Sequence, residues 1–246
     1  MPWIVLESMF YYGLLQGFEG AGRQAREWIS WSVCLIMGFD ALLRPCEICA
    51  TTIGKLALPT SRLHSLVGKG LVTVTNGKNR RMFGRVQIAV LDNDRVLRWL
   101  SWLSAGLPVA VHLLAGGTAR FRALFKQAIH ALGLQSLGLT PSSLRAGGAT
   151  YKFTHENLDI ARIKYRGRWA ALSTLEHYMQ EAAAALAVLK LDGLALDRLE
   201  GLCRFGSHFD SPPEREWSAF FDRKQQVVAA TWTSRRLHAR LRQPKL

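Results

Sequence analysis

The sequence has few acidic residues for its length. Its 246 residues include 18 aspartates and glutamates against 32 lysines and arginines, which gives a net charge of +14. A surplus of this size favours a polyanionic partner, with nucleic acid first and an anionic membrane surface second. The alternative is a basic surface that contacts only solvent. The surplus is densest over residues 235–245, which contain five basic residues and no acidic one.

Cysteine is also scarce. The four cysteines are Cys34, Cys46, Cys49 and Cys203, and their spacing shows no disulfide framework, so we expect a reducing compartment. Cys46 and Cys49 form a CxxC pair, but a four-cysteine zinc site needs a second pair, which the sequence lacks. At helical spacing the two thiols share a face, so we predict that they are buried and do not bind metal.

Long apolar runs and targeting segments are absent. Residues 28–43 are rich in Trp, Ile, Leu and Val, but Asp40 interrupts them. This run is too short to span a bilayer, and we predict a buried helix there. Residues 1–18 are apolar but have no basic leader and no small-residue cleavage site, so we expect a protein that is not secreted. No membrane partner is expected.

Apolar periodicity predicts a mainly α fold with a small antiparallel β-sheet, an α+β class. Helices are expected over residues 4–18, 23–36 and 39–49. The N-cap residues expected for later helices are Asp92 or Asn93, Thr118, Thr140 and Asn157 or Asp159.

Two alternating segments predict a β-hairpin. Residues 71–75 alternate with period two and end at Asn76-Gly77, a turn pattern, and residues 86–90 alternate again. A strand near residues 52–58 is expected to complete the sheet. The hairpin loop contains the basic residues Lys78, Arg80 and Arg81.

Two later segments place polar residues on helices. Thr140-Pro141 predicts the start of a helix that carries Arg145 in its second turn, and Gly147 and Gly148 would let another element approach closely. Residues 173–176 have the pattern of a capping box. They place Tyr178 in the first two turns of the next helix.

Five residues together provide what an enzyme needs to break a DNA strand without metal. They are Arg44, Lys78, Arg145, Trp169 and Tyr178. A tyrosine can attack a phosphate, arginines can hold its oxygens through their planar fork of donors, and a lysine can protonate the leaving group. Neither a metal nor another cofactor is then required. Taken singly, each residue has a structural explanation, as a helix-end cation, a hairpin lysine or a core aromatic.

The order and spacing of this set resemble the tyrosine recombinase family, the phage-integrase-like DNA breaking-rejoining enzymes. Residues 43–47, Leu-Arg-Pro-Cys-Glu, match the family's Leu-Arg-x-x-Glu motif, and Lys78 follows a strand in a hairpin turn, as the family's lysine does. Trp169 lies nine residues before Tyr178, as the family's His or Trp lies before the nucleophile. The resemblance covers roughly residues 20–189.

Two further motifs refine the resemblance. Residues 142–145, Ser-Ser-Leu-Arg, match the family's His-x-x-Arg at the arginine alone, because Ser142 replaces the histidine. A serine hydroxyl can bond to a phosphate but is not a base near neutral pH. Residues 144–150, Leu-Arg-Ala-Gly-Gly-Ala-Thr, resemble divergent eukaryotic, transposon-borne members.

The resemblance implies a role for each residue. Tyr178 attacks the scissile phosphate to give a 3′-phosphotyrosine, Arg44 and Arg145 bind its oxygens, and Lys78 protonates the 5′ oxygen. Trp169 supports the phosphate pocket.

The resemblance also implies partners. Ser142 is an auxiliary phosphate contact, and Arg80, Arg81 and Arg168 contact DNA. Double-stranded DNA and a homotetramer on two DNA sites are the expected partners.

The expected domains are a helix over residues 1–19, left from a core-binding domain, a catalytic domain over 20–192, and a basic tail over 193–246. The expected location is the nucleus in a eukaryote and the cytoplasm otherwise. Three alternatives remain open: a DNA-binding remnant of a mobile element without turnover, a type IB topoisomerase-like enzyme, and a basic protein that binds RNA or a membrane surface.

Overall fold

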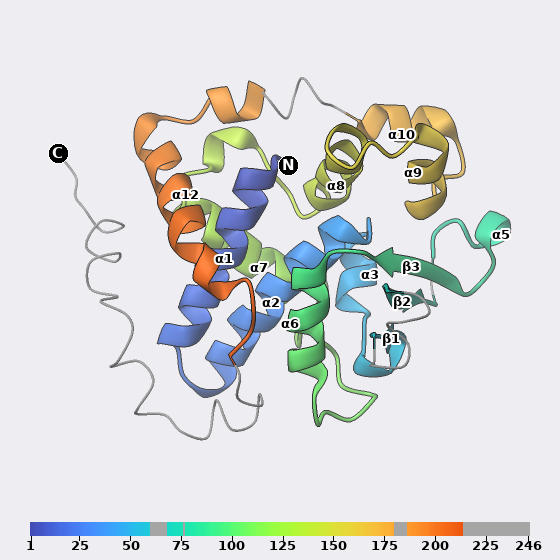
Figure 1. The fold of residues 1–246 in the computed structure, drawn as a ribbon, viewed down its shortest axis with the longest axis horizontal. Coiled ribbons are helices and arrows are strands. Elements are labelled where there is room, and N and C mark those ends of the chain that lie inside the picture. Colours follow the sequence, from blue (N-terminus) through green and yellow to red (C-terminus); the bar gives the residue numbers. More distant parts are fainter. Residues whose placement is uncertain (60–67, 76, 180–185, 214–246) are drawn as a thin grey trace.

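The computed structural model describes residues 1–59, 68–75, 77–179 and 186–213. Within them the chain is mainly helical and has a three-stranded antiparallel sheet, which confirms the predicted α+β class. Figure 1 shows most helices gathered around α1 and α2, with the sheet and helices α8, α9 and α10 at the opposite end.

The main core is built around a pair of long helices. Helix α1 (Trp3–Glu19) packs along α2 (Gly22–Asp40), which is buried over most of its length. The buried helix predicted for residues 28–43 ends at Asp40, and residues 41–44 interrupt the one predicted for 39–49. A Cβ atom on Gly13 would lie 2.0 Å from the Ser32 hydroxyl, so glycine is needed where the two helices approach most closely. Burial of this apolar surface is the main stabilising contribution.

Three further helices complete the main core. Helix α6 (Asp94–Ser104) and helix α7 (Gly117–Ala131) contact α2, and α12 (Gly193–Gly206) packs against α1. Residues 193–206, the start of the expected basic tail, therefore form a regular helix on the same core as residues 1–19. The remaining tail after residue 213 lies outside the described residues.

The predicted hairpin is confirmed. Strands β1 (Leu56–Ala57), β2 (Gly70–Val74) and β3 (Gln87–Leu91) form the sheet in the order β1-β2-β3, with Thr73 opposite Ile88. The loop between β2 and β3 carries the short helix α5 (Arg80–Phe83), which extends away from the body of the molecule (Figure 1). Asn76, part of the predicted turn, lies outside the described residues.

Three helices form a second, smaller unit, which we call the α8–α10 lobe. They are α8 (Ser143–Thr154), α9 (Ile160–Arg166) and α10 (Leu172–Tyr178). The lobe has its own small hydrophobic cluster, separate from the main core, made of Leu42, Ala149, Ile163, Trp169 and Leu175.

Gly148 lets α8 cross α2 closely. A Cβ atom at this position would lie 2.1 Å from the Phe39 carbonyl oxygen, and one on Gly147 would lie 2.3 Å from the Met1 carbonyl oxygen. The predicted close approach at both glycines is confirmed.

Two of the predicted helix caps are confirmed. Asn93 accepts a hydrogen bond from Val96 N at 3.3 Å, and Asp159 accepts one from Arg162 N at 2.7 Å.

Other predicted caps are wrong. Helix α7 begins after Gly116, in a left-handed conformation that glycine adopts without strain, so Thr118 lies inside the helix. A turn in which Ser143 N donates to Thr140 O precedes helix α8. The helix therefore begins at Ser143, and Arg145 lies in its first turn. Helix α10 begins after Ala171, without the expected capping box.

The prediction of two buried CxxC thiols is half wrong. Helix α3 (Pro45–Cys49) is a single turn at the edge of the core, so Cys49 is buried and Cys46 faces solvent. No cluster of three or more potential metal ligands occurs among the described residues. In the same ranges, no helix has the length and apolar character needed to cross a membrane.

Candidate functional site

Glu47 is the centre of the candidate site, and local chain geometry fixes it. Arg44 precedes α3, Pro45 occupies its first position, and Glu47 follows one turn later. The Arg44 backbone N–H donates to Glu47 Oε2 at 2.9 Å, and Arg44 Nη1 donates to Oε1 at 2.7 Å. This reciprocal bonding holds the Glu47 carboxylate and the Arg44 guanidinium together.

Two more guanidinium groups approach the same carboxylate. Arg168 Nη2 donates to Glu47 Oε2 at 2.9 Å, and Arg145 Nη1 lies 3.9 Å from that oxygen. The three arginines come from the start of α3, the first turn of α8 and the segment after α9. We call these three arginines and Glu47 the Glu47 cluster. It carries three positive charges and one negative charge, an excess of two.

Burial makes this excess costly. Burial alone would raise the pKa of Glu47. The charge of Arg168 and the hydrogen bonds from Arg44 lower it by more, so the pKa is below its usual range. Burial, with the charges of Arg44 and Arg168, lowers the pKa of Arg145 to about 9. The excess itself follows from the geometry, which places one carboxylate between three guanidinium groups that stay charged at neutral pH.

Two observations indicate where an anion would fit. Arg145 Nη1 is buried and makes no hydrogen bond within the described chain. The Arg44 side chain remains 22% exposed, so the cluster is partly open to solvent on the Arg44 side. A buried donor without a partner costs about 1–3 kcal/mol, which a bound oxyanion would offset.

The backbone next to the cluster is strained. Leu42 and Arg168 have φ angles of +52° and +57°, in the left-handed region that favours glycine. The Arg168 side chain is buried, and its Nη2 also lies 3.5 Å from the Leu42 carbonyl oxygen. Such strain is frequent at functional sites, where the surrounding contacts maintain it.

Trp169 forms one wall of the site. Its ring is buried, and the Arg145 guanidinium lies over it, with Cζ 4.3 Å from the ring centroid. Arg145 Nη2 donates to the Gly167 carbonyl oxygen. A Cβ atom on Gly167 would overlap the indole ring at 1.6 Å, so only glycine fits here. Arg145 is thus held from two sides.

Tyr178 reaches the same place from α10. It is the last residue of that helix, its side chain is half-buried, and its ring centroid lies 5.7 Å from that of Trp169 at an interplanar angle of 48°. The phenol is close enough to Arg145 to influence the pKa of that guanidinium. The structure therefore brings Arg44, Arg145, Trp169 and Tyr178 together.

Lys78 is the predicted site residue that no described contact joins to this group. It is exposed in the loop after β2, and no hydrogen bond or ion pair joins it to another described residue. The neighbouring Asn79 donates through Nδ2 to the Arg168 carbonyl oxygen at 2.8 Å. This bond attaches the base of the hairpin loop to the Glu47 cluster, 89 residues away in sequence.

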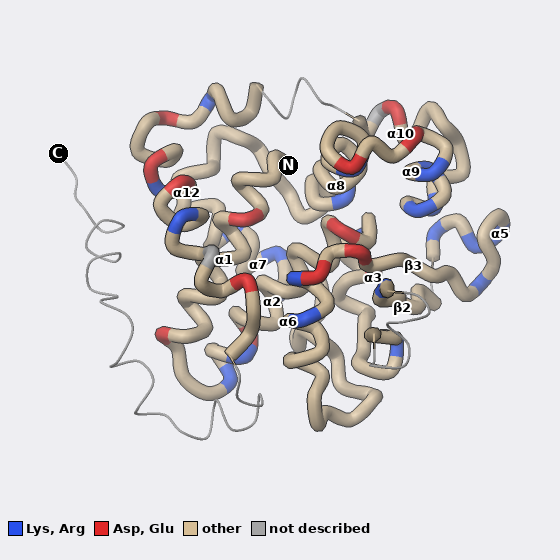
Figure 2. The backbone as a smooth tube through the Cα atoms, in the orientation of Figure 1, with Lys and Arg blue, Asp and Glu red and all other residues tan. Residues whose placement is uncertain are grey.

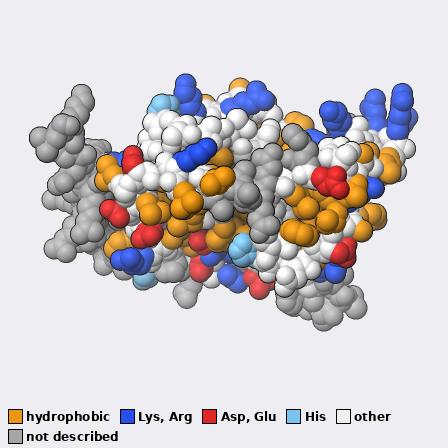
Figure 3. All heavy atoms as spheres, turned by 90° about the horizontal axis from the view of Figure 1, so that it is seen from above, with side chains coloured by type: hydrophobic (Ala, Val, Ile, Leu, Met, Phe, Trp, Pro, Cys, Tyr) orange, Lys and Arg blue, Asp and Glu red, His pale blue; other side chains and the backbone are white. Residues whose placement is uncertain are grey.

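The outer residues of the predicted site form a basic edge. Arg80 and Arg81 are exposed on α5, and Ser142 is exposed just before α8. In Figure 2, lysines and arginines (blue) lie along the hairpin and α9. Figure 3 shows their side chains projecting at that end of the molecule.

Arg168 is placed differently from the DNA contact predicted for it. It is 3% exposed and paired with Glu47, so it orients the cluster from behind.

Sequence reasoning missed the central role of Glu47, although the residue is the last one of the Leu-Arg-x-x-Glu motif. It also missed Asn79 and Gly167. The three-residue spacing between Arg44 and Glu47 could have indicated their pairing, but the contacts of Asn79 and Gly167 arise only when distant segments meet.

A second buried network attaches the lobe to the body. Lys152 Nζ on α8 lies 2.9 Å from Asp40 Oδ1, with 1% and 7% of the side chains exposed. Asp40 Oδ2 accepts hydrogen bonds from the backbone N–H groups of Asp92 and Asn93 at 2.9 and 3.1 Å. Arg166 on α9 pairs with Asp92. Charged contacts thereby set the position of α8 and α9 relative to the sheet.

The site combines fixed positive charge, an indole wall and a phenol hydroxyl. This combination is suited to binding a phosphate ester and to attacking it. No model of a known protein family, no curated protein and no solved structure matches this chain.

Proposed function

We propose that this protein cleaves and rejoins DNA strands, in recombination or integration, through a covalent bond between DNA and Tyr178. One observation carries the proposal: Arg44, Arg145, Trp169 and Tyr178 come from four separate segments and meet beside an uncompensated positive charge. Each residue has a structural explanation when taken singly, but those explanations do not account for the convergence.

In the proposed reaction, the Tyr178 hydroxyl oxygen attacks the phosphorus of a phosphodiester. The bond from phosphorus to the 5′ oxygen breaks, and a 3′-phosphotyrosine forms. Lys78 gives a proton to the departing 5′ oxygen. Arg44 and Arg145 bind the two non-bridging oxygens, where charge increases in the transition state. Rejoining reverses these steps, because the phosphotyrosine retains the bond energy.

Glu47 and Arg168 are positioning residues in this proposal. Glu47 keeps Arg44 and Arg145 oriented, and the strained Arg168 fixes Glu47 from the buried side. Positioning of this kind keeps donors in place before the reaction, so that none has to reorganise during it.

The proposal extends to architecture and partners. Under it, the domain has the fold of a tyrosine recombinase catalytic domain, and the protein assembles as a homotetramer on double-stranded DNA. The exposed Lys78, Arg80 and Arg81 support a DNA surface next to the site. The corresponding location is the nucleus of a eukaryotic host, or the cytoplasm otherwise.

A suicide substrate tests the proposal. A duplex with a nick close to the scissile phosphate loses a short fragment after cleavage, so the covalent adduct cannot rejoin and accumulates on a denaturing gel. Because the target sequence is unknown, a pool of nicked duplexes with randomised sequence is used. Tyr178→Phe should abolish the adduct and leave DNA affinity unchanged, because it removes only a hydroxyl group.

Tyr165→Phe provides the matched control, since Tyr165 is 76% exposed on α9 and lies outside the site. The proposal fails if an adduct forms equally in Tyr178→Phe, or if a different tyrosine is found attached to DNA by mass spectrometry of the trapped complex.

A second candidate is DNA binding without turnover. Two observations favour it: Arg145 is 3% exposed with one nitrogen bonded to the Gly167 carbonyl, and the position expected for a histidine base holds Ser142. Wild-type protein that binds duplex DNA in a salt-dependent way but forms no adduct, even after Ser142→His, would establish this candidate.

A further inference from the structure

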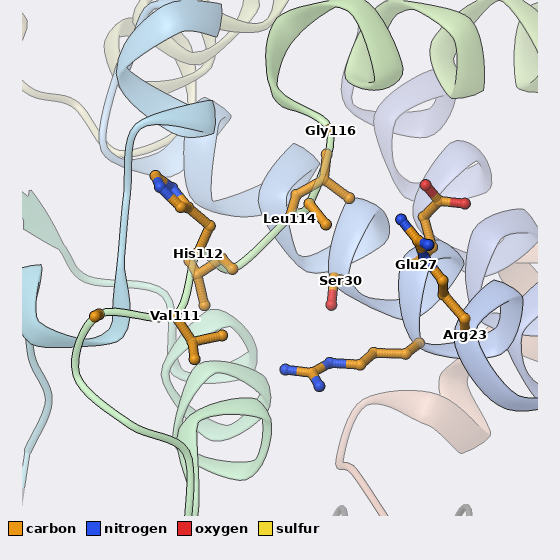
Figure 4. Close-up of a pocket in the computed structure, with 11 residues that line it drawn as sticks. Arg23, Glu27, Ser30, Val111, His112, Leu114 and Gly116 are labelled. Carbon is orange, nitrogen blue, oxygen red and sulfur yellow. The ribbon is translucent and has the colours of Figure 1, made fainter.

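A cavity of about 570 Å³ lies at the other end of α2 from the Glu47 cluster. It lies between the first turns of α2 and the segment 110–116 that leads into α7, and Figure 4 shows its lining. The α2 residues that line the cavity lie 10 to 17 positions before Asp40, so the two places are about 15–25 Å apart along the helix axis. The cavity is therefore separate from the site described above.

The cavity is basic on the α2 side. Arg23 and Arg26 both line it, and no hydrogen bond or ion pair joins Arg23 to another residue of the described chain. Glu27 is the acidic residue of the lining, and its two oxygens accept hydrogen bonds from Arg120 at 2.5 Å each. Since Arg120 neutralises Glu27, the charge of Arg23 makes this side of the cavity positive.

A buried hydroxyl group points into the cavity. Ser30 is only 3% exposed, and its hydroxyl makes no hydrogen bond with any other described residue. In Figure 4 the Ser30 side chain lies between Val111 on one side and Arg23 on the other. Nearby Ser32, by contrast, bonds to the Trp28 carbonyl oxygen at 3.0 Å. The rest of Ser30 is buried, so its hydroxyl is open to the cavity alone and can bond to a ligand atom there.

The opposite rim supplies backbone donors and an apolar surface. Gly116, in a left-handed conformation, precedes α7, whose first turn has no side-chain cap and no acidic residue. The free N–H groups of such a helix start attract an anion. Val111 and Leu114 contribute an apolar wall. That wall is firmly held, since Ile53 N donates to Val111 O at 2.9 Å.

We infer that this cavity binds a phosphorylated organic molecule of about mononucleotide size. The phosphate lies between Arg23 and the start of α7, Ser30 bonds to the ligand from the floor, and the apolar body rests on Val111 and Leu114. The volume is within the usual range of about 300–1,000 Å³ for small-molecule sites. The inference is independent of the DNA chemistry proposed for Tyr178.

Calorimetric titration of the full chain tests the inference, with adenosine 5′-monophosphate as the probe. Adenosine and inorganic phosphate serve as partial probes. We expect saturable binding of the mononucleotide, and weaker binding of either part. Arg23→Gln should weaken mononucleotide binding about tenfold or more, because it removes a charge-assisted contact, and Ser30→Ala should weaken it about fivefold.

Two matched variants control for charge and for helix stability. Lys126→Gln removes the same charge from an exposed position on α7, and Ser32→Ala removes a hydroxyl from α2 outside the cavity. Both should bind the probe like wild type. Equal weakening by Arg23→Gln and Lys126→Gln, or no saturable binding by wild type, would overturn the inference.

Two further measurements show whether the probe binds in the cavity or at the Glu47 cluster, and whether the cavity takes a small molecule or the DNA backbone. Arg44→Gln should leave mononucleotide binding intact, and a loss of binding there would show that the probe had occupied the Glu47 cluster instead. A short DNA duplex should not displace the probe. If it does, and Arg23→Gln weakens duplex binding as strongly as probe binding, the cavity holds the DNA backbone and the small-molecule inference is wrong.

Discussion

The main core and the α8–α10 lobe are held in place by different forces. In the main core, large apolar side chains such as Trp31 and Leu35 are fully buried, and glycine lets α1 and α2 approach closely. The lobe has a small apolar cluster of its own, and α8 packs closely on α2. Buried charged pairs, among them Lys152–Asp40 and Arg168–Glu47, add a second kind of attachment to the body.

This difference has a functional consequence. Apolar burial is roughly proportional to area and has no preferred direction, so its main contribution is to stability. Charged hydrogen bonds need specific distances and angles. The main core therefore supplies stability, while the lobe supplies accurate placement of Arg145, Trp169 and Tyr178. The following predictions test this division, from the largest expected effect to the smallest.

Trp31→Ala should have the largest effect, because it removes a fully buried side chain from the main core. Trp31 also donates through Nε1 to the Phe121 carbonyl oxygen at 3.2 Å. We expect a loss of about 4 kcal/mol in the free energy of unfolding, measured by urea denaturation. Val109→Ala, at a side chain that is 70% exposed, should change it by less than about 0.5 kcal/mol. Similar losses for the two variants would contradict the division.

Glu47→Ala should act on the lobe and the site. It leaves Arg44, Arg145 and Arg168 without their shared anion, and removing one partner of a buried pair costs about 3 kcal/mol. Phosphate added to the buffer should restore part of this loss by occupying the vacated position, which thermal unfolding would show. Glu200→Ala, on the exposed side of α12, is the control and should show neither the loss nor the rescue.

An equal phosphate effect on both glutamate variants would mean that the ion acts on the whole surface and not at the Glu47 cluster. Such a result would contradict the claim that charged contacts position the lobe, because the three arginines would not need a specific anion.

A double change in the hairpin, Arg80→Gln with Arg81→Gln, should weaken DNA binding and leave stability unchanged. Both side chains are exposed, and each phosphate contact contributes about one unit to the slope of log affinity against log salt. We expect the slope to fall by about two, measured by fluorescence anisotropy at several salt concentrations. Arg122→Gln with Lys126→Gln, both exposed on α7, should leave the slope nearly unchanged.

The smallest effect should be the pH dependence of stability. Burial raises the pKa of Glu47 and of Asp92, but Arg168 and Arg166 respectively lower each pKa below its ordinary value. Carboxylates of this kind contribute stability above their unfolded pKa and lose it as pH falls through the folded pKa. Stability should therefore decline from about pH 5 downwards, and Glu47→Gln should flatten that decline. An unchanged acid slope would show that Glu47 is not paired in solution.

Local pattern predicted much of the secondary structure. Alternation over residues 71–75 and 86–90 was enough to predict the hairpin, because successive side chains on a strand point to opposite faces. Asp159 and Asn93 were each one of two residues predicted as a cap, because such side chains bond within their own turn. The caps predicted at Thr118 and Ser173 were wrong. Helix α7 begins after the left-handed Gly116 and helix α10 after the extended Ala171, and neither start has a side-chain hydrogen bond.

The amino-acid sequence by itself determined the class of fold, the basic character and the set of residues that could act on phosphate. Only the tertiary structure decided that Arg44, Arg145 and Arg168 share Glu47, that Arg168 is buried, and that Ser30 opens into a separate cavity. The reason is physical. Periodicity and capping depend on neighbours within a few positions, whereas burial and the excess of charge depend on segments as far as 121 residues apart that meet only after folding.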